Sequence, residues 1–224
     1  ARIAQEERRI QGLQSYIQAI PKAEIILGNS KSTQKLTKQI DQAASTLQPI
    51  IFQAQAGTGK TFFAGMIHAR SDVADEPFAE LDCLKLPRSE DGRLNTDLLF
   101  GRIDAQAGII ELLERGTLLL NNVQILSNGD RTRLIDYLST GLILPNHGII
   151  SKNHLATEPP QSIQSWVRLI FASPQKLDLP DIDALTIKLP TLNQRKADIT
   201  DFARYFLNQF CQQQNRPLLQ IDQS

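Results

Sequence analysis

The sequence predicts a three-layer α/β domain of the P-loop type with a parallel sheet, followed by the start of a helical lid. Short apolar runs alternate with stretches of helical periodicity, which is typical of strands joined by helices in a parallel sheet. One apolar run leads directly into a glycine-rich phosphate loop. A helical pattern after Pro190 indicates the lid. We expect a linker helix over 1–22, a nucleotide-binding core over 23–192 and a truncated lid over 193–224.

Composition excludes several classes of protein. The 224 residues are 41% hydrophobic and 21% charged, which is ordinary for a globular chain. Lys+Arg and Asp+Glu both number 24, so the net charge is zero. This balance argues against a nucleic-acid-binding or membrane-surface module. No apolar run reaches the ~18–20 residues of a membrane span. Cys83 and Cys211 lack metal-ligand spacing, so we expect a reducing, cytoplasmic location.

The elements are predicted in chain order. Residues 1–20 have helical apolar spacing, as in a linker helix or a partner-binding helix. Ser30 or Ser32 is a suitable N-cap for a helix that carries Leu36 and Ile40. Further strands are expected at 49–52, 78–81, 117–120 and 166–172, helices at 107–114 and 131–138, a loop or hairpin at 141–165, and a helix from Lys196 onward.

The phosphate loop is the strongest chemical signal. Its residues follow an apolar strand and precede a helix: Ala56, Gly57, Thr58, Gly59, Lys60 and Thr61. Small residues let backbone N–H groups turn toward phosphate oxygens at a helix N-terminus. The pattern assigns Lys60 to the outer phosphates and the Thr61 hydroxyl to Mg²⁺. Ala54 stands where the full pattern has glycine, at an expected cost of about 1 kcal/mol if φ is positive there.

Other reactive side chains predict no site. His68, His147 and His154 lack metal spacing, and core or solvated positions are expected for them. Cys83 follows a predicted buried strand and should behave as a small apolar residue. Trp166 is predicted to pack in the core. The cations are scattered, so no nucleic-acid groove is expected.

Several short segments surround the phosphate loop in a specific order: Leu27–Ser30, Ile67–Ala69, Pro77–Cys83, Leu98–Gly101, Arg115–Leu120 and Leu189–Ile199. With the loop, they resemble the AAA+ domain of the sigma-54-interacting (NtrC-like) transcription activators over about residues 25–220. The matching family patterns are IGxS, AIH, PFVAVNC, ELFG, GGTLFL and LPPLRERKEDI. The resemblance implies an AAA+ core with ATP or ADP and Mg²⁺ between the core and a helical lid.

The catalytic positions depart from this family. Its GTLFL strand is followed by Asp-Glu, where the Asp supports Mg²⁺ and the Glu orients the attacking water. Here the pair is Asn121-Asn122. An amide is a poor base and brings no negative charge to a metal. No catalytic residue is therefore predicted, and Mg²⁺ dependence is expected to be weak.

Two further family features are missing. The sigma-contacting GAFTGA loop that follows ELFG is absent, because Gly101 runs through a short segment into the next predicted helix. The family's arginine fingers follow the sensor strand, whereas residues 175–188 contain no arginine. An arginine finger accelerates hydrolysis by about 10³–10⁵ where it operates.

One pair of substitutions has a structural interpretation. In the family, the Asn of VNC can hydrogen-bond the catalytic Glu. The corresponding residues here are Asp82 and Asn122, so carboxylate and amide have changed places. A retained hydrogen bond and independent drift both fit this exchange. The first predicts that the two side chains lie within hydrogen-bond distance.

Three functions remain open from the sequence. The leading one is a catalytically degenerate AAA+ module that binds ATP or ADP weakly or not at all, with a regulatory or structural role in a larger protein. The second is an active ATPase that remodels a sigma factor and regulates transcription. The third is a nucleotide-free interaction scaffold. The expected partners are proteins, including other AAA+ protomers or domains of the same chain, with no nucleic acid and no membrane.

Overall fold

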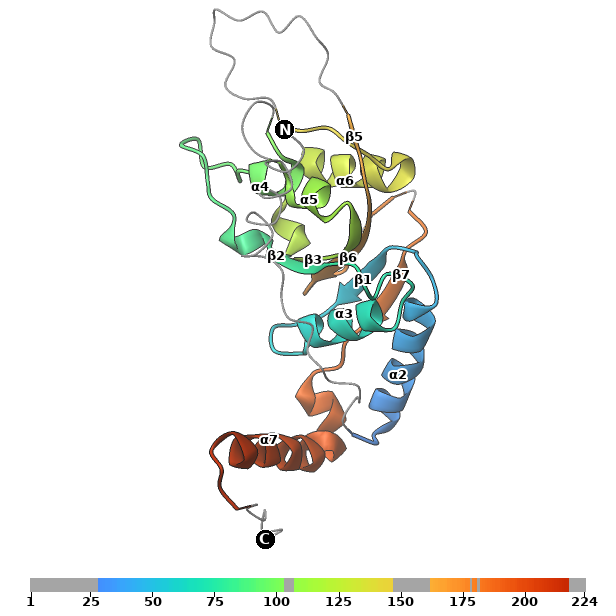
Figure 1. Ribbon diagram of the computed structural model, residues 1–224, viewed down its shortest axis with the longest axis vertical. Helices are drawn as coiled ribbons and strands as arrows, with labels where there is room; N and C mark the ends of the chain where they lie inside the picture. Colours follow the sequence, from blue (N-terminus) through green and yellow to red (C-terminus); the bar gives the residue numbers. More distant parts are fainter. Residues whose placement is uncertain (1–27, 103–106, 147–161, 178, 181, 218–224) are drawn as a thin grey trace, which may run out of the picture.

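The computed structural model describes residues 28–102, 107–146, 162–177, 179–180 and 182–217. Its centre is a five-stranded sheet in the order β2-β3-β6-β1-β7 (Figure 1). All neighbouring pairs are parallel. The strands are β1 (Ile50–Gln53), β2 (Phe78–Asp82), β3 (Arg115–Asn121), β6 (Trp166–Ser173) and β7 (Leu185–Lys188). The predicted α/β class with a parallel sheet is therefore confirmed.

Helices cover both faces of the sheet and give the three predicted layers (Figure 1). On one face lie α2 (Lys31–Ala44) and α3 (Lys60–Ala69). On the other lie α4 (Asp97–Phe100), α5 (Ile109–Leu113) and α6 (Asn128–Thr140). The 3₁₀ helices η1 (Cys83–Lys85) and η2 (Val123–Ile125) follow β2 and β3.

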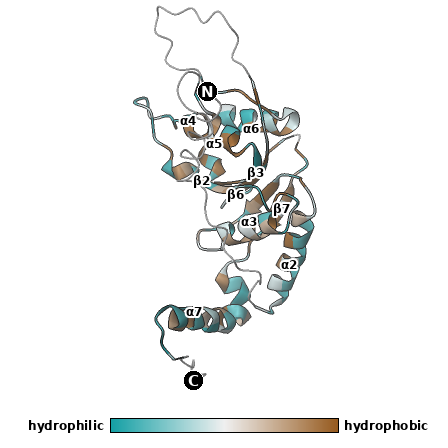
Figure 2. Cartoon of the chain, in the orientation of Figure 1, coloured by the Kyte–Doolittle hydropathy of each residue, from teal (hydrophilic) through white to brown (hydrophobic). Residues whose placement is uncertain are grey.

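Each face has its own apolar cluster. Residues of α2 and α3 pack with alternate strand residues, among them Phe78 and Leu119. Their strand neighbours Ala79, Leu118 and Leu120 point into the cluster with α4, α5 and α6. This alternation is the two-residue period of a strand. Figure 2 shows both hydrophilic and hydrophobic residues on α2, α6 and α7, as expected for helices with one buried side.

Polar caps fix where the flanking helices begin. Ser30 is the N-cap of α2, and its hydroxyl accepts a hydrogen bond from Thr33 N at 3.2 Å. Ser127 caps α6 in the same way through Asp130 N at 3.1 Å. Of the two serines offered by the sequence, Ser30 is therefore the cap of α2.

A helical segment follows the last strand. The 3₁₀ helix η3 (Leu192–Asp198) leads into α7 (Ile199–Gln213), below the sheet in Figure 1. This agrees with the helical pattern expected from Lys196. The division into linker, core and lid at 22 and 192 stays a prediction, and the helix predicted over 1–20 lies outside the described residues.

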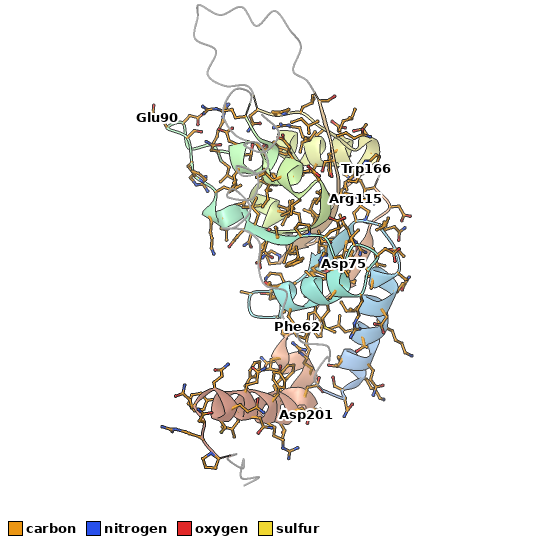
Figure 3. The ribbon with its side chains drawn as sticks, viewed as in Figure 1. Phe62, Asp75, Glu90, Arg115, Trp166 and Asp201 are labelled. Atoms are coloured by element: carbon orange, nitrogen blue, oxygen red, sulfur yellow. The ribbon has the colours of Figure 1, made fainter. Side chains whose placement is uncertain are left out.

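Two expectations change with the structure. The edge strand β7 is not among the predicted strands, because its four residues alternate in exposure and follow no long apolar run. The prediction that Trp166 packs in the core is wrong, since the side chain is 64% exposed. Trp166 is the first residue of β6 and lies beside Gly141, at the end of α6 (Figure 3). The predicted excursion at 141–165 begins and ends as an antiparallel pair, β4 (Leu142–Ile143) with β5 (Ile163–Gln164).

Candidate nucleotide site

The phosphate loop connects the carboxyl end of β1 to the first turn of α3. Gly57 has φ of 75° and Gly59 has φ of 92°, a region that glycine enters without strain. Gly59 is the N-cap of α3, so the first N–H groups of that helix face the loop. A Cβ atom at Gly57 would meet nothing within 4 Å, which leaves open space above the loop.

Ala54 fits the loop without the expected strain. In the described ranges, the non-glycine residues with positive φ are Glu114, Asn122 and Asn215. Ala54 is buried, and its N–H donates to the Ser173 carbonyl at the end of β6 at 2.9 Å. The predicted cost of replacing glycine at this position is therefore not incurred.

The Gln55 carbonyl accepts hydrogen bonds from two side chains of the loop. Lys60 Nζ donates to it at 3.1 Å, and Thr58 Oγ1 donates to it at 2.9 Å. The Gln55 side chain is exposed and does not take part in these contacts. Thr61, the predicted Mg²⁺ ligand, is half-buried in the first turn of α3. Lys60 thus lies beside the loop and can exchange one carbonyl oxygen for phosphate oxygens.

Arg195 reaches the loop from the C-terminal segment. Its side chain is 7% exposed, and Nη2 donates to the Thr58 carbonyl at 3.4 Å. Nε and Nη1 are buried without hydrogen-bond partners. The guanidinium carbon lies 4.9 Å from the centre of the Phe202 ring and 6.0 Å from that of Phe63. Burial lowers the pKa of Arg195, and the charge of Asp198 partly opposes this.

Asp198 fixes this segment to the start of α2. Its carboxylate accepts hydrogen bonds from Ser30 N at 2.8 Å, Ser30 Oγ at 2.7 Å and Thr33 Oγ1 at 2.6 Å. Burial alone would raise the pKa of Asp198, but the hydrogen bonds from Thr33 and Ser30 and the charge of Arg195 outweigh it, and the pKa is lowered. Gly28 approaches so closely that a Cβ would lie 2.3 Å from Asp198 Cγ.

The carboxyl end of β3 carries amides that contact carboxylates on β2. Asn122 Nδ2 donates to Asp82 Oδ1 at 2.8 Å, which confirms the predicted contact. Asn121 Nδ2 donates to Glu80 Oε1. The sequence prediction missed Glu80, Arg195 and Asp198. Arg195 and Asp198 could have been found only from the segment 189–199, which matches a family pattern and contains the predicted boundary between core and lid at 192.

The remaining candidate residues are structural. His68 is buried, its Nδ1 lies 2.9 Å from Thr117 Oγ1, and burial lowers its pKa. Burial raises the pKa of Cys83 to about 12, so this thiol is no nucleophile. In the part of the chain that the structure describes, no group of three or more His, Cys, Asp or Glu could hold a metal ion. Among the same residues, no helix has the length and apolar character to cross a bilayer. His147 and His154 lie outside the described residues.

The two ends of the segment between α4 and α5 lie close together. The helix α4 ends at Phe100, and a Cβ on Gly108 would lie 2.2 Å from Gly101 N and 2.5 Å from Phe100 C. The two ends of segment 101–108 therefore touch, and the backbone of Gly108 occupies the space beside Gly101. Residues 103–106 lie outside the described ranges.

A phosphate loop after the first strand of this parallel sheet, with a helical segment contacting it, defines a P-loop AAA+ domain. Residues 26–178 match the model of the sigma-54 interaction domain. The chain belongs to this family.

The chain is also similar in sequence to curated regulatory proteins. The chain is 29% identical to the Nif-specific regulatory protein of Rhizobium etli over 212 residues, 86% of this chain and 34% of that protein. It is 24% identical to the protein of the same description in Azotobacter vinelandii, over 88% of this chain and 39% of that protein. The chain thus spans about a third of the length of these relatives.

Solved structures agree on the fold. NtrX from Brucella abortus, crystallised with ADP, superimposes with a TM-score of 0.73 at 19% identity, over 99% of this chain and 47% of that one. The ATP complex of NtrX gives the same TM-score over 100% of this chain and 48% of that one.

Proposed function

We propose that this chain is the nucleotide-binding module of a larger regulator, which binds ATP or ADP weakly and does not hydrolyse ATP at a useful rate. The observation that carries this is the contrast between the two ends of the site. The phosphate loop keeps Gly57, Gly59, Lys60 and Thr61, whereas β3 ends in the amide Asn121 and a second amide, Asn122, follows it. Binding and hydrolysis depend on different groups, so one can persist without the other.

The binding half of the site is supported by unused donors. The first turn of α3 presents backbone N–H groups, and the buried Arg195 guanidinium has two nitrogens without partners. A polyphosphate would satisfy both kinds of donor. NtrX, which shares this fold, was crystallised with ATP and with ADP, which makes the same ligands reasonable for this chain.

The hydrolytic half lacks its base. Asn122 cannot accept a proton from water at neutral pH, because an amide is not basic. Residues 175–188 offer no arginine to a neighbouring protomer. We therefore infer a regulatory or structural role, in the cytoplasm and among protein partners, in which bound nucleotide sets the position of η3 and α7.

A second candidate is favoured by family membership. A sigma-54 interaction domain that acts as an ATP-driven remodeller would contact a sigma factor and regulate transcription. This chain would need a catalytic base and a contact loop from elsewhere, such as an active protomer in a mixed ring. Faster phosphate release by an active protomer mixed with this chain than by the active protomer alone would favour this second candidate over the first.

Thermal melting with and without millimolar ATP or ADP tests the first proposal, with Lys60→Ala and the exposed Lys38→Ala as matched variants. A ligand at about 100 times its Kd stabilises by about 2.7 kcal/mol, a shift of a few degrees. We expect the shift in the parent and in Lys38→Ala, its loss in Lys60→Ala, and no phosphate release. If nucleotide shifts the melting temperature of none of the three proteins, the interaction scaffold is favoured instead.

A further inference from the structure

Two carboxylates on β2 lie beside the amides that end β3. Glu80 Oε1 accepts from Asn121 Nδ2, and Asp82 Oδ1 accepts from Asn122 Nδ2 at 2.8 Å. The pairing register places Asp82 opposite Asn121 and Glu80 opposite Leu119, two residues before the end of β3. The longer Glu80 side chain therefore reaches forward to the strand end. The negative charge absent from β3 is present on its neighbour.

Strand alternation puts Glu80 on the same side of the sheet as the phosphate-loop helix. Phe78 and Leu119 are buried in the cluster that contains Phe63 and Ile67 of α3. Glu80 follows Phe78 by two residues and Asn121 follows Leu119 by two, so both project from that face. The pair thus faces the layer whose helix begins at Lys60.

Asn121 carries an acceptor that no described residue uses. The residue is 6% exposed, and its Oδ1 is buried without a hydrogen-bond partner. The Glu80 carboxylate needs a donor, which fixes Nδ2 toward Glu80 and leaves Oδ1 unpaired. A buried carbonyl oxygen without a donor is destabilising. Amide oxygens bind hard cations or their water ligands, so this atom is suited to a Mg²⁺ site.

Asp82 is not the equivalent group. Its Oδ1 accepts from both Asn122 Nδ2 at 2.8 Å and Leu84 N at 3.0 Å, where Asp82 caps η1. These contacts fix Asp82 as a structural residue at the start of the next turn. Glu80 makes a single side-chain contact with the site, through Asn121.

We propose that Glu80 supplies, from the neighbouring strand, the negative charge that sigma-54 interaction domains carry at the position of Asn121. Together with Asn121 Oδ1 and the Thr61 hydroxyl it would hold the Mg²⁺ of a bound nucleoside triphosphate. This rests on the proposed nucleotide binding and goes beyond it, because the weak Mg²⁺ dependence expected from Asn121 alone is then replaced by a strong one. Hydrolysis is not restored, because Asn122 remains an amide.

The test measures the affinity of the chain for a fluorescent ATP analogue with Mg²⁺ and with a chelator. The variants are Glu80→Gln, which keeps the shape, and Glu90→Gln, at the tip of the loop between η1 and α4 (Figure 3). We expect Mg²⁺ to tighten binding in the parent and in Glu90→Gln. In Glu80→Gln, the factor by which Mg²⁺ increases the affinity for the analogue should be about 10–100-fold smaller, as for other residues that support a metal. Affinity in chelator should be the same in all three proteins.

A charge-relocation variant separates a metal role from a structural strut. Glu80→Gln/Asn121→Asp keeps one carboxylate and one amide but returns the charge to β3. We expect it to recover the Mg²⁺ gain, which a hydrogen-bonded strut alone would not predict. If Glu80→Gln melts well below the parent, Asn121→Leu, which removes the unpaired oxygen, should lose the same gain.

The outcomes distinguish the two proposals. Binding that does not respond to Mg²⁺ in the parent, or responds equally in Glu80→Gln, overturns the role of Glu80 and leaves nucleotide binding intact. Binding in the parent no tighter than in Lys60→Ala overturns both.

Discussion

The Asn122 amide donates a hydrogen bond to the Asp82 carboxylate, with 2.8 Å between Nδ2 and Oδ1. This contact links the last residue of β2 to the residue that follows β3. Asn122 adopts φ of 58° and ψ of 40°, a left-handed conformation that Asn tolerates better than most residues. The contact is therefore a strut between the end of β2 and the start of η2.

Reversal of this pair should be cooperative. Asn122→Asp alone places two carboxylates within hydrogen-bond distance, and Asp82→Asn alone leaves two amides. We expect each single variant to unfold at lower urea concentration than the parent and the double variant to recover, with a coupling energy of about 1–3 kcal/mol. Chemical denaturation of the four proteins measures it. Strictly additive effects would mean that the contact contributes nothing to stability.

Asp198 should be among the most sensitive positions outside the sheet. Asp198→Ala removes the acceptor of three hydrogen bonds from Ser30 and Thr33. We expect a loss of about 2–5 kcal/mol, because the buried Thr33 hydroxyl and the half-buried Ser30 donors are left without an acceptor. Thermal or urea unfolding measures it. The exposed Asp91→Ala on the loop before α4 is the control and should change stability little.

Arg195 should matter for nucleotide and not for the free fold. Arg195→Met keeps most of the volume between Phe63 and Phe202 but removes a buried cation with two unpaired nitrogens. Such a replacement is often neutral or stabilising in the free protein.

With ATP or ADP, we expect the affinity of Arg195→Met to fall about 10–100-fold, the equivalent of one charged hydrogen bond. Titration of a fluorescent nucleotide measures it, and the exposed Arg204→Met is the matched control. Unchanged affinity together with a lowered melting temperature would make Arg195 a purely structural residue.

The buried His68 side chain should make the fold less stable in mild acid. Burial lowers its pKa below the ordinary 6.5, and nearby Arg168 acts in the same direction, whereas Glu76 opposes it. As pH falls, His68 therefore binds a proton in the unfolded chain at a higher pH than in the folded chain. Stability rises with pH as the unfolded histidine loses this proton, and falls below about pH 6.5 by at most about 1.4 kcal/mol per unit.

His68→Leu should remove this dependence. We expect the difference in unfolding free energy between about pH 7.5 and about pH 5.5 to be smaller in the variant than in the parent. Urea unfolding at the two pH values measures it. The same difference in both proteins would show that other groups cause the acid sensitivity.

Much of the fold could be predicted because its signals are local. Buried parallel strands are continuous apolar runs, and β1, β2, β3 and β6 lie where such runs stand. The phosphate loop and the N-cap Ser30 also depend on residues close together in sequence. The edge strand β7 and the exposed Trp166 could not be predicted in this way, since the exposure of a side chain depends on which element covers it.

The sequence by itself determined the α/β class, the position of the phosphate loop and the amides Asn121 and Asn122 at the carboxyl end of β3 and directly after it. It also predicted the contact between Asp82 and Asn122, because a known pair had exchanged residue types. Only the tertiary structure decided that Glu80 contacts Asn121, that Arg195 reaches Thr58 and that Asp198 joins η3 to α2. These contacts join residues 41, 137 and 165 positions apart. The physical reason is that strand register and chain path, rather than spacing in sequence, set which side chains meet.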